Sequence, residues 1–418
     1  MKQDLYLDFR DVFRIPRVAL SGKKIWTHFT ANVIGYILFM VFSYIAMLIS
    51  GYSFGEIWQH YHFFPFPYDV MLSWLGWIFY FIGGLLWAIA YYFASLAVAR
   101  ITYKEFKGDF FYSSGDGWRF VKKHWHPLIF GPLSVIGIVV FFIIAAIVAA
   151  LLGKIPYVGE FIFSLPYLLY FPVAIFVLYT FVVFAIVLTF APAIVGTSEE
   201  DTLETVFQSY SLLWAQPWRL VTYETLWSFL VTIAFYIIGF VMTAGIMFIS
   251  FVFGAQWLMG DKLFRMMESA IFYLGGDSSV FYLFVNLLFS PFQGAGHLMV
   301  GSTGLNGTES VATVFLALSF FVIMFVIISY ATALDSVGQT IIYLILRKKK
   351  DDENLLERKD EDEIAEEEEQ AKLDEEDEDE ELEDLEDFDL DEDLEEDEDE
   401  QSDEDEDEDS EDEDKPQE

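Results

Sequence analysis

The 418-residue chain contains no cysteine, which excludes disulfide bonds, thiolate nucleophiles and thiolate metal ligands together. It also lacks a glycine-rich phosphate loop, a catalytic pair of carboxylates and a serine–histidine motif. Histidine is scarce, and His60 and His62, two residues apart on a helix, would face different ways. We therefore expect no enzymatic activity, no catalytic residues, and no cofactor or metal site.

Charge is scarce in most of the chain and abundant at one end. The last 68 residues hold 46 of the 65 acidic residues and only four basic ones. The first 350 residues carry 20 bases and 19 acids and are nearly neutral. The net charge of −41 therefore belongs to the terminal segment, and whole-chain charge says little about the rest.

Long runs without charge dominate the first 350 residues. Several exceed the roughly 20 apolar residues that cross the hydrocarbon of a bilayer, and they are apolar all round, unlike helices of a soluble core. The sequence predicts an all-α fold with six membrane spans, at residues 29–50, 70–99, 128–152, 161–190, 218–253 and 311–346. Two stretches stay open, because each can span the membrane, re-enter it or lie in the interface: 161–171, which Pro166 interrupts, and 281–300.

The distribution of bases predicts the topology. Seventeen of the bases before residue 351 lie on one side of the six spans and three on the other. Because cytoplasmic loops carry the excess of lysine and arginine, both termini are expected in the cytoplasm. The acidic segment would then begin on the cytoplasmic side, directly after the basic residues 347–350.

Two segments outside the spans are amphipathic. Residues 1–28 carry an apolar stripe with arginines beside it. Residues 200–215 place apolar side chains at helical spacing, which predicts a helix in the interface or under the bundle. Thr197 with Glu200, or Ser198 with Asp201, would cap that helix at its N-terminus.

Within the last predicted span, four polar residues recur at helical spacing. An ionisable group inside a membrane is costly unless it is paired or hydrated, so the aspartate makes this stripe the best functional candidate. One interpretation is interhelical hydrogen bonding, with Asn32 or Glu224 as partner; the other is a path for protons or a solute. The stripe consists of Thr332, Asp335, Ser336 and Gln339.

The acidic segment cannot bury enough apolar surface to offset chain entropy, so we expect it to be disordered. Apolar residues nevertheless interrupt the acids. Leu382, Leu385 and Phe388 form a candidate docking motif for a basic partner, whereas the simpler interpretation is a solvated polyanion.

Short motifs lie at residues 191–194 (APAI), 209–211 (SYS), 217–219 (PWR), 11–26, 155–160 and 340–347. Together they resemble an uncharacterised family of bacterial multi-pass membrane proteins, typical of planctomycete genomes. A distant similarity links the same layout to the membrane domain associated with glycerophosphodiester phosphodiesterases, whose catalytic domain is missing here. The chain departs from the family pattern at Gln208, where arginine is usual, and in its long acidic tail. The resemblance implies a fold and a location only.

The sequence thus predicts a cytoplasmic amphipathic segment (1–28), a six-span domain (29–350) and a disordered polyanionic cytoplasmic tail (351–418). The function expected is that of a non-enzymatic scaffold or organiser of the bacterial inner membrane, which recruits basic partners through the tail. The alternative is a small-solute or ion transporter that uses the stripe around Asp335. Expected partners are the lipid bilayer and basic cytoplasmic proteins or cations, without nucleic acid; the oligomeric state, the substrate and the partner's identity stay open.

Overall fold

A computed structural model describes residues 5–67, 70–276, 305–359, 363–364 and 371. Its regular secondary structure is entirely helical in these ranges, which confirms the all-α fold. The chain divides into two compact units, Met1–Arg358 and Lys359–Glu418, and the helices described below belong to the first. The segment 281–300 and the candidate docking motif of the tail lie outside the described residues.

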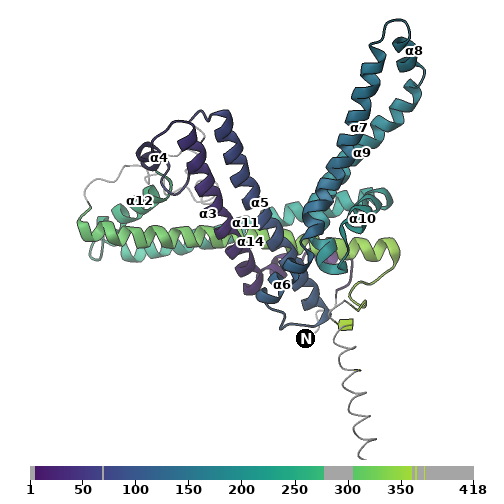
Figure 1. Ribbon diagram of the computed structural model, residues 1–418. Coiled ribbons are helices and arrows are strands. Elements are labelled where there is room, and N and C mark those ends of the chain that lie inside the picture. Colours follow the sequence, from purple (N-terminus) through teal and green to yellow (C-terminus); the bar gives the residue numbers. More distant parts are fainter. Residues whose placement is uncertain (1–4, 68–69, 277–304, 360–362, 365–370, 372–418) are drawn as a thin grey trace, which may run out of the picture. The chain divides into compact units, whose positions relative to one another are not determined.

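In the part of the chain that the structure describes, six helices are long and apolar enough to cross a membrane, and they match the six expected spans (Figure 1). The charge-free runs form continuous helices because the backbone polar groups must be satisfied within the segment when lipid surrounds it. The chain is a multi-pass integral membrane protein. The six helices are α3 (Gly22–Ile49), α5 (Trp74–Lys107), α7 (His126–Gly153), α9 (Tyr167–Ser198), α11 (Pro217–Phe253) and α14 (Gly307–Asp351).

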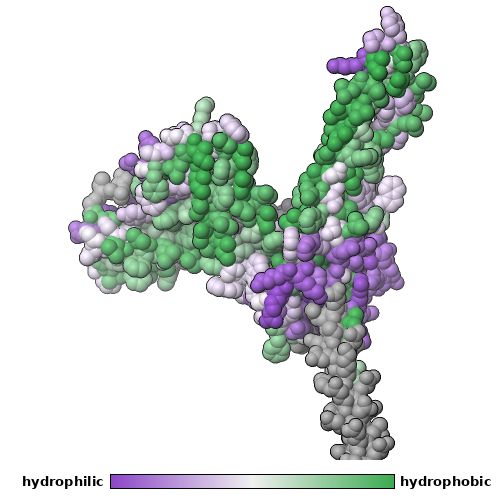
Figure 2. All heavy atoms as spheres, viewed as in Figure 1, coloured by the Kyte–Doolittle hydropathy of each residue, from purple (hydrophilic) through white to green (hydrophobic). Residues whose placement is uncertain are grey.

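Apolar side chains cover the outside of these helices. Figure 2 shows hydrophobic surface along much of α7 and α9. Within the most apolar stretch of α7 only 11% of the residues are buried, and side chains such as Phe141 and Leu151 are exposed. Such a surface is unfavourable in water and expected in contact with acyl chains.

Within the described residues, seven shorter helices connect or flank the long ones. Ser53 opens α4 and Ser113 opens α6, each in a capping box that satisfies backbone donors of the first turn. The short helices are α1 (Phe9–Val12), α2 (Ile15–Ala19), α4 (Phe54–Tyr61), α6 (Ser114–His124), α8 (Gly159–Ser164), α10 (Thr202–Ala215) and α12 (Asp261–Gly275).

The structure resolves the stretch 161–171. Helix α8 ends at Ser164, and α9 begins at Tyr167 with Pro166 as its N-cap residue. A proline has no N–H to donate, so it fits the start of a helix better than its interior. This stretch is therefore a short helix followed by a span, and Pro172 lies inside the uninterrupted α9.

The expected helix at 200–215 exists as α10, but its predicted cap was wrong. Thr197 and Ser198 still belong to α9, where the Thr197 hydroxyl donates to the carbonyl of Ala193. The cap is Asp201, whose carboxylate accepts from the Glu204 N–H at 2.9 Å. Because α9 continues past the proline of the APAI motif, the chain turns only at Glu199 and Glu200.

Helix α14 occupies a central place in the first unit, because it packs against α3, α5, α9, α11 and α12. Its second half is almost fully buried from Val337 to Leu346. Two of the helices that contact α14, α5 and α9, also approach each other closely. A Cβ on Gly196 of α9, for example, would lie 2.8 Å from the Ala99 Cβ of α5. The polar stripe of α14 therefore faces other helices of the bundle.

Candidate functional site

The first residue of the stripe, Thr332, pairs with α3. The Asn32 amide donates to Thr332 Oγ1 at 3.2 Å and to Ser329 Oγ at 3.4 Å, and its carbonyl oxygen accepts from the Trp87 indole of α5 at 3.4 Å. Asn32 is only 2% exposed, so each of these bonds satisfies a group that would be costly to leave alone in an apolar surrounding. Three helices meet at this amide.

Asp335 and Gln339 extend the contacts to α5 and α11. The Tyr91 hydroxyl donates to Asp335 Oδ2. One turn further, Gln339 Nε2 donates to Glu224 Oε2 at 3.3 Å. The stripe thus connects two carboxylates from different spans through one amide, and Asn32 and Glu224 are the two partners that the sequence suggested.

Ser336 adds a contact that sequence reasoning missed, because its Oγ lies 2.8 Å from His28 Nε2 of α3. A serine beside a histidine is the arrangement that activates a nucleophile. Here the other ring nitrogen, Nδ1, is buried without a hydrogen-bond partner among the described residues, so no carboxylate orients the ring. The pair connects two helices, and it lacks the third member of a triad within the described chain.

A small cavity lies beside this cluster, between α5, α9 and α14. Its volume is about 190 Å³, which is enough for several water molecules. Asp335, Ser336 and Gln339 line it, and Thr332 does not. The remaining lining residues are Tyr91, Tyr92, Ser95, Leu188, Thr189, Pro192 and Ala193.

We call the end of the bundle at which α3 begins and α5 and α9 end the base-rich end. Two buried ion pairs of the described chain lie there. Lys24 Nζ lies 2.8 Å from Glu105 Oε2, and Arg100 Nη2 lies 2.6 Å from Glu199 Oε1. Neither basic side chain is exposed, and the Arg100 guanidinium also lies over the Phe120 ring at 4.6 Å. Each charge is paired, as burial requires.

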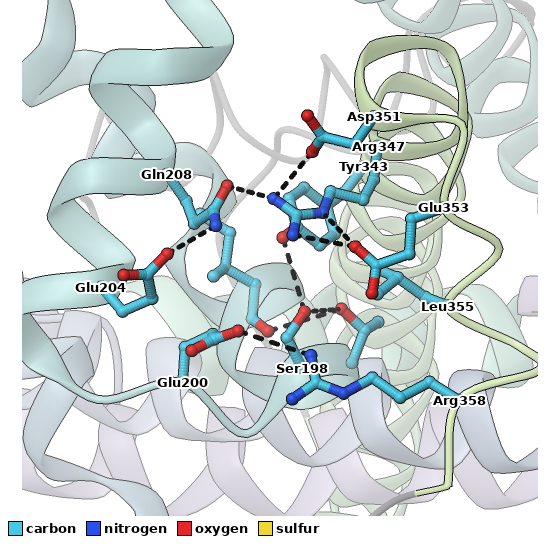
Figure 3. A network of polar contacts seen from close by, with 12 residues as sticks. Ser198, Glu200, Glu204, Gln208, Tyr343, Arg347, Asp351, Glu353, Leu355 and Arg358 are labelled. Atoms are coloured by element: carbon cyan, nitrogen blue, oxygen red, sulfur yellow. Dashed lines mark hydrogen bonds and ion pairs between the residues drawn. The ribbon is translucent and has the colours of Figure 1, made fainter.

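A second polar network surrounds Arg347 near the end of α14 (Figure 3). Arg347 Nη1 donates to Gln208 Oε1 of α10 at 2.5 Å, and Gln208 Nε2 donates to Glu204 Oε1 at 2.6 Å. Arg347 also pairs with Asp351 at 3.1 Å and with Glu353 at 3.0 Å. Gln208 therefore joins α10 to α14.

The residues that follow α14 fold back on the bundle. Leu355 is 2% exposed, and its carbonyl oxygen accepts from the Tyr103 hydroxyl of α5 at 2.8 Å. Lys107 donates to the carbonyl of Arg358 at 2.7 Å, and Arg358 lies 3.7 Å from Glu200. The first eight residues of the acidic segment are thus part of the first compact unit.

Glu200, at the junction of α9 and α10, sits in an unfavourable place for a negative charge. Burial raises the pKa of its carboxyl, and the neighbouring charge of Glu204 raises it further, while Arg358 and Arg347 oppose the shift. The pKa therefore lies above its ordinary value of 4.5. This junction holds more acids than the nearby bases neutralise.

The four stripe residues do lie in one cluster, but their partners were only partly recognisable. Asn32 and Glu224 are polar residues in apolar runs, which is a visible signal. Tyr91 and His28 carried none, because tyrosine is common in membrane spans and His28 lies at a predicted boundary. The candidate docking residues Leu382, Leu385 and Phe388 lie outside the described residues.

These features define a multi-pass membrane protein with a hydrogen-bonded polar cluster inside its bundle. Among the described residues, no group of three histidine, cysteine or acidic side chains is arranged to hold a metal ion. No protein-family model matches the chain, and neither a curated protein nor a solved structure shows significant similarity to it.

Proposed function

We propose that the protein is a non-enzymatic scaffold of the bacterial inner membrane whose acidic C-terminal segment recruits basic cytoplasmic partners. The observation that carries this proposal is the separation of charge: a nearly neutral bundle bears a terminal segment with 46 acids and four bases. A polyanion at the membrane surface raises the local concentration of basic proteins and speeds their encounter.

The start of that segment supports the proposal. Leu355 and the backbone of Arg358 are held by α5, so the acids that follow leave from a fixed point on the bundle. A membrane scaffold needs such an attachment, because the attachment keeps the acidic segment at the membrane surface.

The polar cluster supports a structural role for the stripe. Each of its four side chains makes a hydrogen bond to a residue of another span. The pair of Ser336 and His28 lacks a carboxylate that orients the ring among the described residues. These contacts support the proposal that the protein is not an enzyme.

The placement of both termini in the cytoplasm, and membership of the uncharacterised bacterial multi-pass family, belong to the same proposal. The base-rich end supports the cytoplasmic placement of both termini, because Lys24, Arg100 and Arg347 all lie there. The second rests on the motifs quoted above, and most of these meet in the structure near the second half of α14. A compartment-sensitive reporter fused after Glu418 tests the topology, and activity typical of the outside would contradict it.

The recruitment proposal is tested with the full chain in lipid nanodiscs and two defined probes, a decalysine peptide and a basic amphipathic peptide. We expect both to bind at low salt and to be released as salt rises past about 0.15 M, where the screening length falls below about 8 Å. Replacing Leu382, Leu385 and Phe388 by serine distinguishes the two interpretations of the tail. A docking motif loses the amphipathic peptide only, whereas a simple polyanion keeps both. Binding of neither peptide at low salt would remove the scaffold proposal.

A second candidate function, the transport of a small solute or ion, is favoured by one observation: Asp335 lines a cavity of about 190 Å³. The test is flux through vesicles that contain the parent or Asp335→Asn. The scaffold proposal expects no flux that depends on Asp335. A flux present in the parent and lost in the variant would establish the transporter instead.

A further inference from the structure

The hydroxyl groups that line the cavity between α5, α9 and α14 already donate their protons in hydrogen bonds within the protein. Ser95 Oγ donates to the carbonyl oxygen of Tyr91 at 3.0 Å, and Thr189 Oγ1 donates to that of Ala185 at 2.9 Å. The Tyr91 hydroxyl itself donates to Asp335. Each hydroxyl has one proton and two lone pairs, so these groups can offer only lone pairs to the cavity.

The other two hydroxyls behave in the same way. Tyr92 donates to the carbonyl of Val187 at 3.1 Å. Ser336 donates to the carbonyl of Thr332 at 3.1 Å, while His28 provides its second contact. Serine and threonine hydroxyls often bond to the carbonyl one turn earlier in a helix, but five committed hydroxyls around one cavity leave it without a hydroxyl donor.

The amide of Gln339 adds an acceptor to the cavity. Its Nε2 donates to Glu224, while its Oε1 is buried and has no hydrogen-bond partner among the described residues. Gln339 is 6% exposed, so the oxygen has no ready access to bulk water. A buried acceptor of this kind is costly unless something in the cavity satisfies it.

The charge of the lining also favours a cation. Asp335 contributes a carboxylate, and no lysine, arginine or histidine is among the residues that line the cavity. The described wall therefore combines one negative charge with neutral oxygen atoms. Carboxylate, hydroxyl and amide oxygens are the ligands that hard metal cations prefer.

We propose that this cavity binds a small monovalent cation of the alkali-metal class, with Asp335 as its charged ligand. The neutral ligands are oxygens of Ser95, Ser336 and Gln339. One carboxylate balances one positive charge, which favours a monovalent ion over a divalent one. The site deepens the second candidate function by naming its ion class, but a bound cation can equally serve to stabilise the bundle.

The test measures the melting temperature of the full chain in nanodiscs as NaCl or KCl replaces N-methylglucamine chloride at constant ionic strength. A ligand that binds only the folded state raises Tm with the logarithm of its concentration once the site saturates, so we expect a rise with Na⁺ or K⁺. Asp335→Asn should abolish this rise. The variant should still fold, since an amide oxygen accepts the Tyr91 hydrogen bond.

Two further variants sharpen the result. Ser95→Ala removes one neutral ligand without changing charge, and should shift the midpoint of the rise to a roughly tenfold higher cation concentration. Glu160→Gln removes an exposed charge on α8 and should leave the rise unchanged. All variants keep the acidic segment, so cations that bind there contribute equally to each.

An equal rise in Asp335→Asn and the parent would overturn the proposal, and so would a parent that responds alike to Na⁺, K⁺ and N-methylglucamine. In the latter case the cavity holds water only. If Asp335→Asn does not fold, an unchanged midpoint in Ser95→Ala would overturn the proposal just as well. Flux is measured separately: a Tm rise without flux leaves the binding site standing and removes the transport function.

Discussion

Gly338 of α14 lies directly beneath the indole ring of Trp227 on α11. A Cβ at this position would collide with the indole nitrogen, and Trp227 is only 4% exposed, so the ring has little room to move. Glycine in the middle of a helix costs about 1 kcal/mol relative to alanine, and here that cost permits a close contact between two spans.

We predict that Gly338→Ala lowers the free energy of unfolding by about 1–3 kcal/mol, because overpacking outweighs the gain in helix propensity. Thermal unfolding in detergent measures the change. Gly84→Ala on α5 is the matched control, since a Cβ there meets nothing within 4 Å. That variant should be as stable as the parent or more so. Equal effects at the two positions would show that the Trp227 contact does not matter.

At the same scale, the sequence revealed those residues whose presence in an apolar run is costly. Asp335, Asn32 and Glu224 are visible for that reason. Tyr91 and His28 were missed because their importance depends on which helices become neighbours, and the pattern along one helix does not encode that. The cavity was equally invisible in the sequence, because it depends on how side chains of α5, α9 and α14 pack together.

At the scale of elements, the six spans were predictable because length and hydropathy decide whether a segment can cross a bilayer. The ends of elements were less predictable. Asp201 replaced Thr197 and Ser198 as the cap of α10 because α9 continues through its second proline, Pro192. Local cap signals recur along a chain, and tertiary packing selects among them.

The junction of α9 and α10 makes stability depend on pH. The pKa of Glu200 is higher in the folded protein than its ordinary value of 4.5. At a pH between 4.5 and the pKa of the folded protein, the folded state therefore binds more protons than the unfolded state. Stability contributed by this group is therefore lost as pH rises through that window. We predict that the Tm of Glu200→Gln, relative to the parent, increases between pH 4.5 and pH 7.

Because many acids titrate in this range, only the difference between variant and parent is informative. Glu160→Gln, an exposed change on α8, should give a difference that does not vary with pH. A constant difference for Glu200→Gln as well would mean that burial at the junction has no effect on its titration.

At the scale of the whole molecule, the border between the bundle and the acidic segment differs between sequence and structure. The run of acids begins at Asp351, yet the first compact unit extends to Arg358. We predict that truncation after Arg358, which removes 42 acids and three bases, leaves Tm unchanged. Truncation after Lys350 should cost about 3 kcal/mol, because it removes the buried Leu355 and leaves the Tyr103 hydroxyl without its acceptor.

Leu355→Ala in the full chain should reproduce most of that loss, and it separates packing from charge. Equal stability of the two truncated proteins would place the whole acidic segment outside the folded unit. A loss after truncation at Arg358 would instead require contacts between the bundle and residues beyond it.

The attachment at residues 352–358 also determines how the molecule would carry mechanical load. A pull on the chain beyond Arg358 reaches the Lys107 bond to its carbonyl and the Tyr103 bond to Leu355 before it reaches the end of α14. Both bonds lead to α5, which is itself packed along α3 and α9. Tension on the acidic segment would therefore be distributed over several spans, so that a single helix is not drawn out of the bilayer.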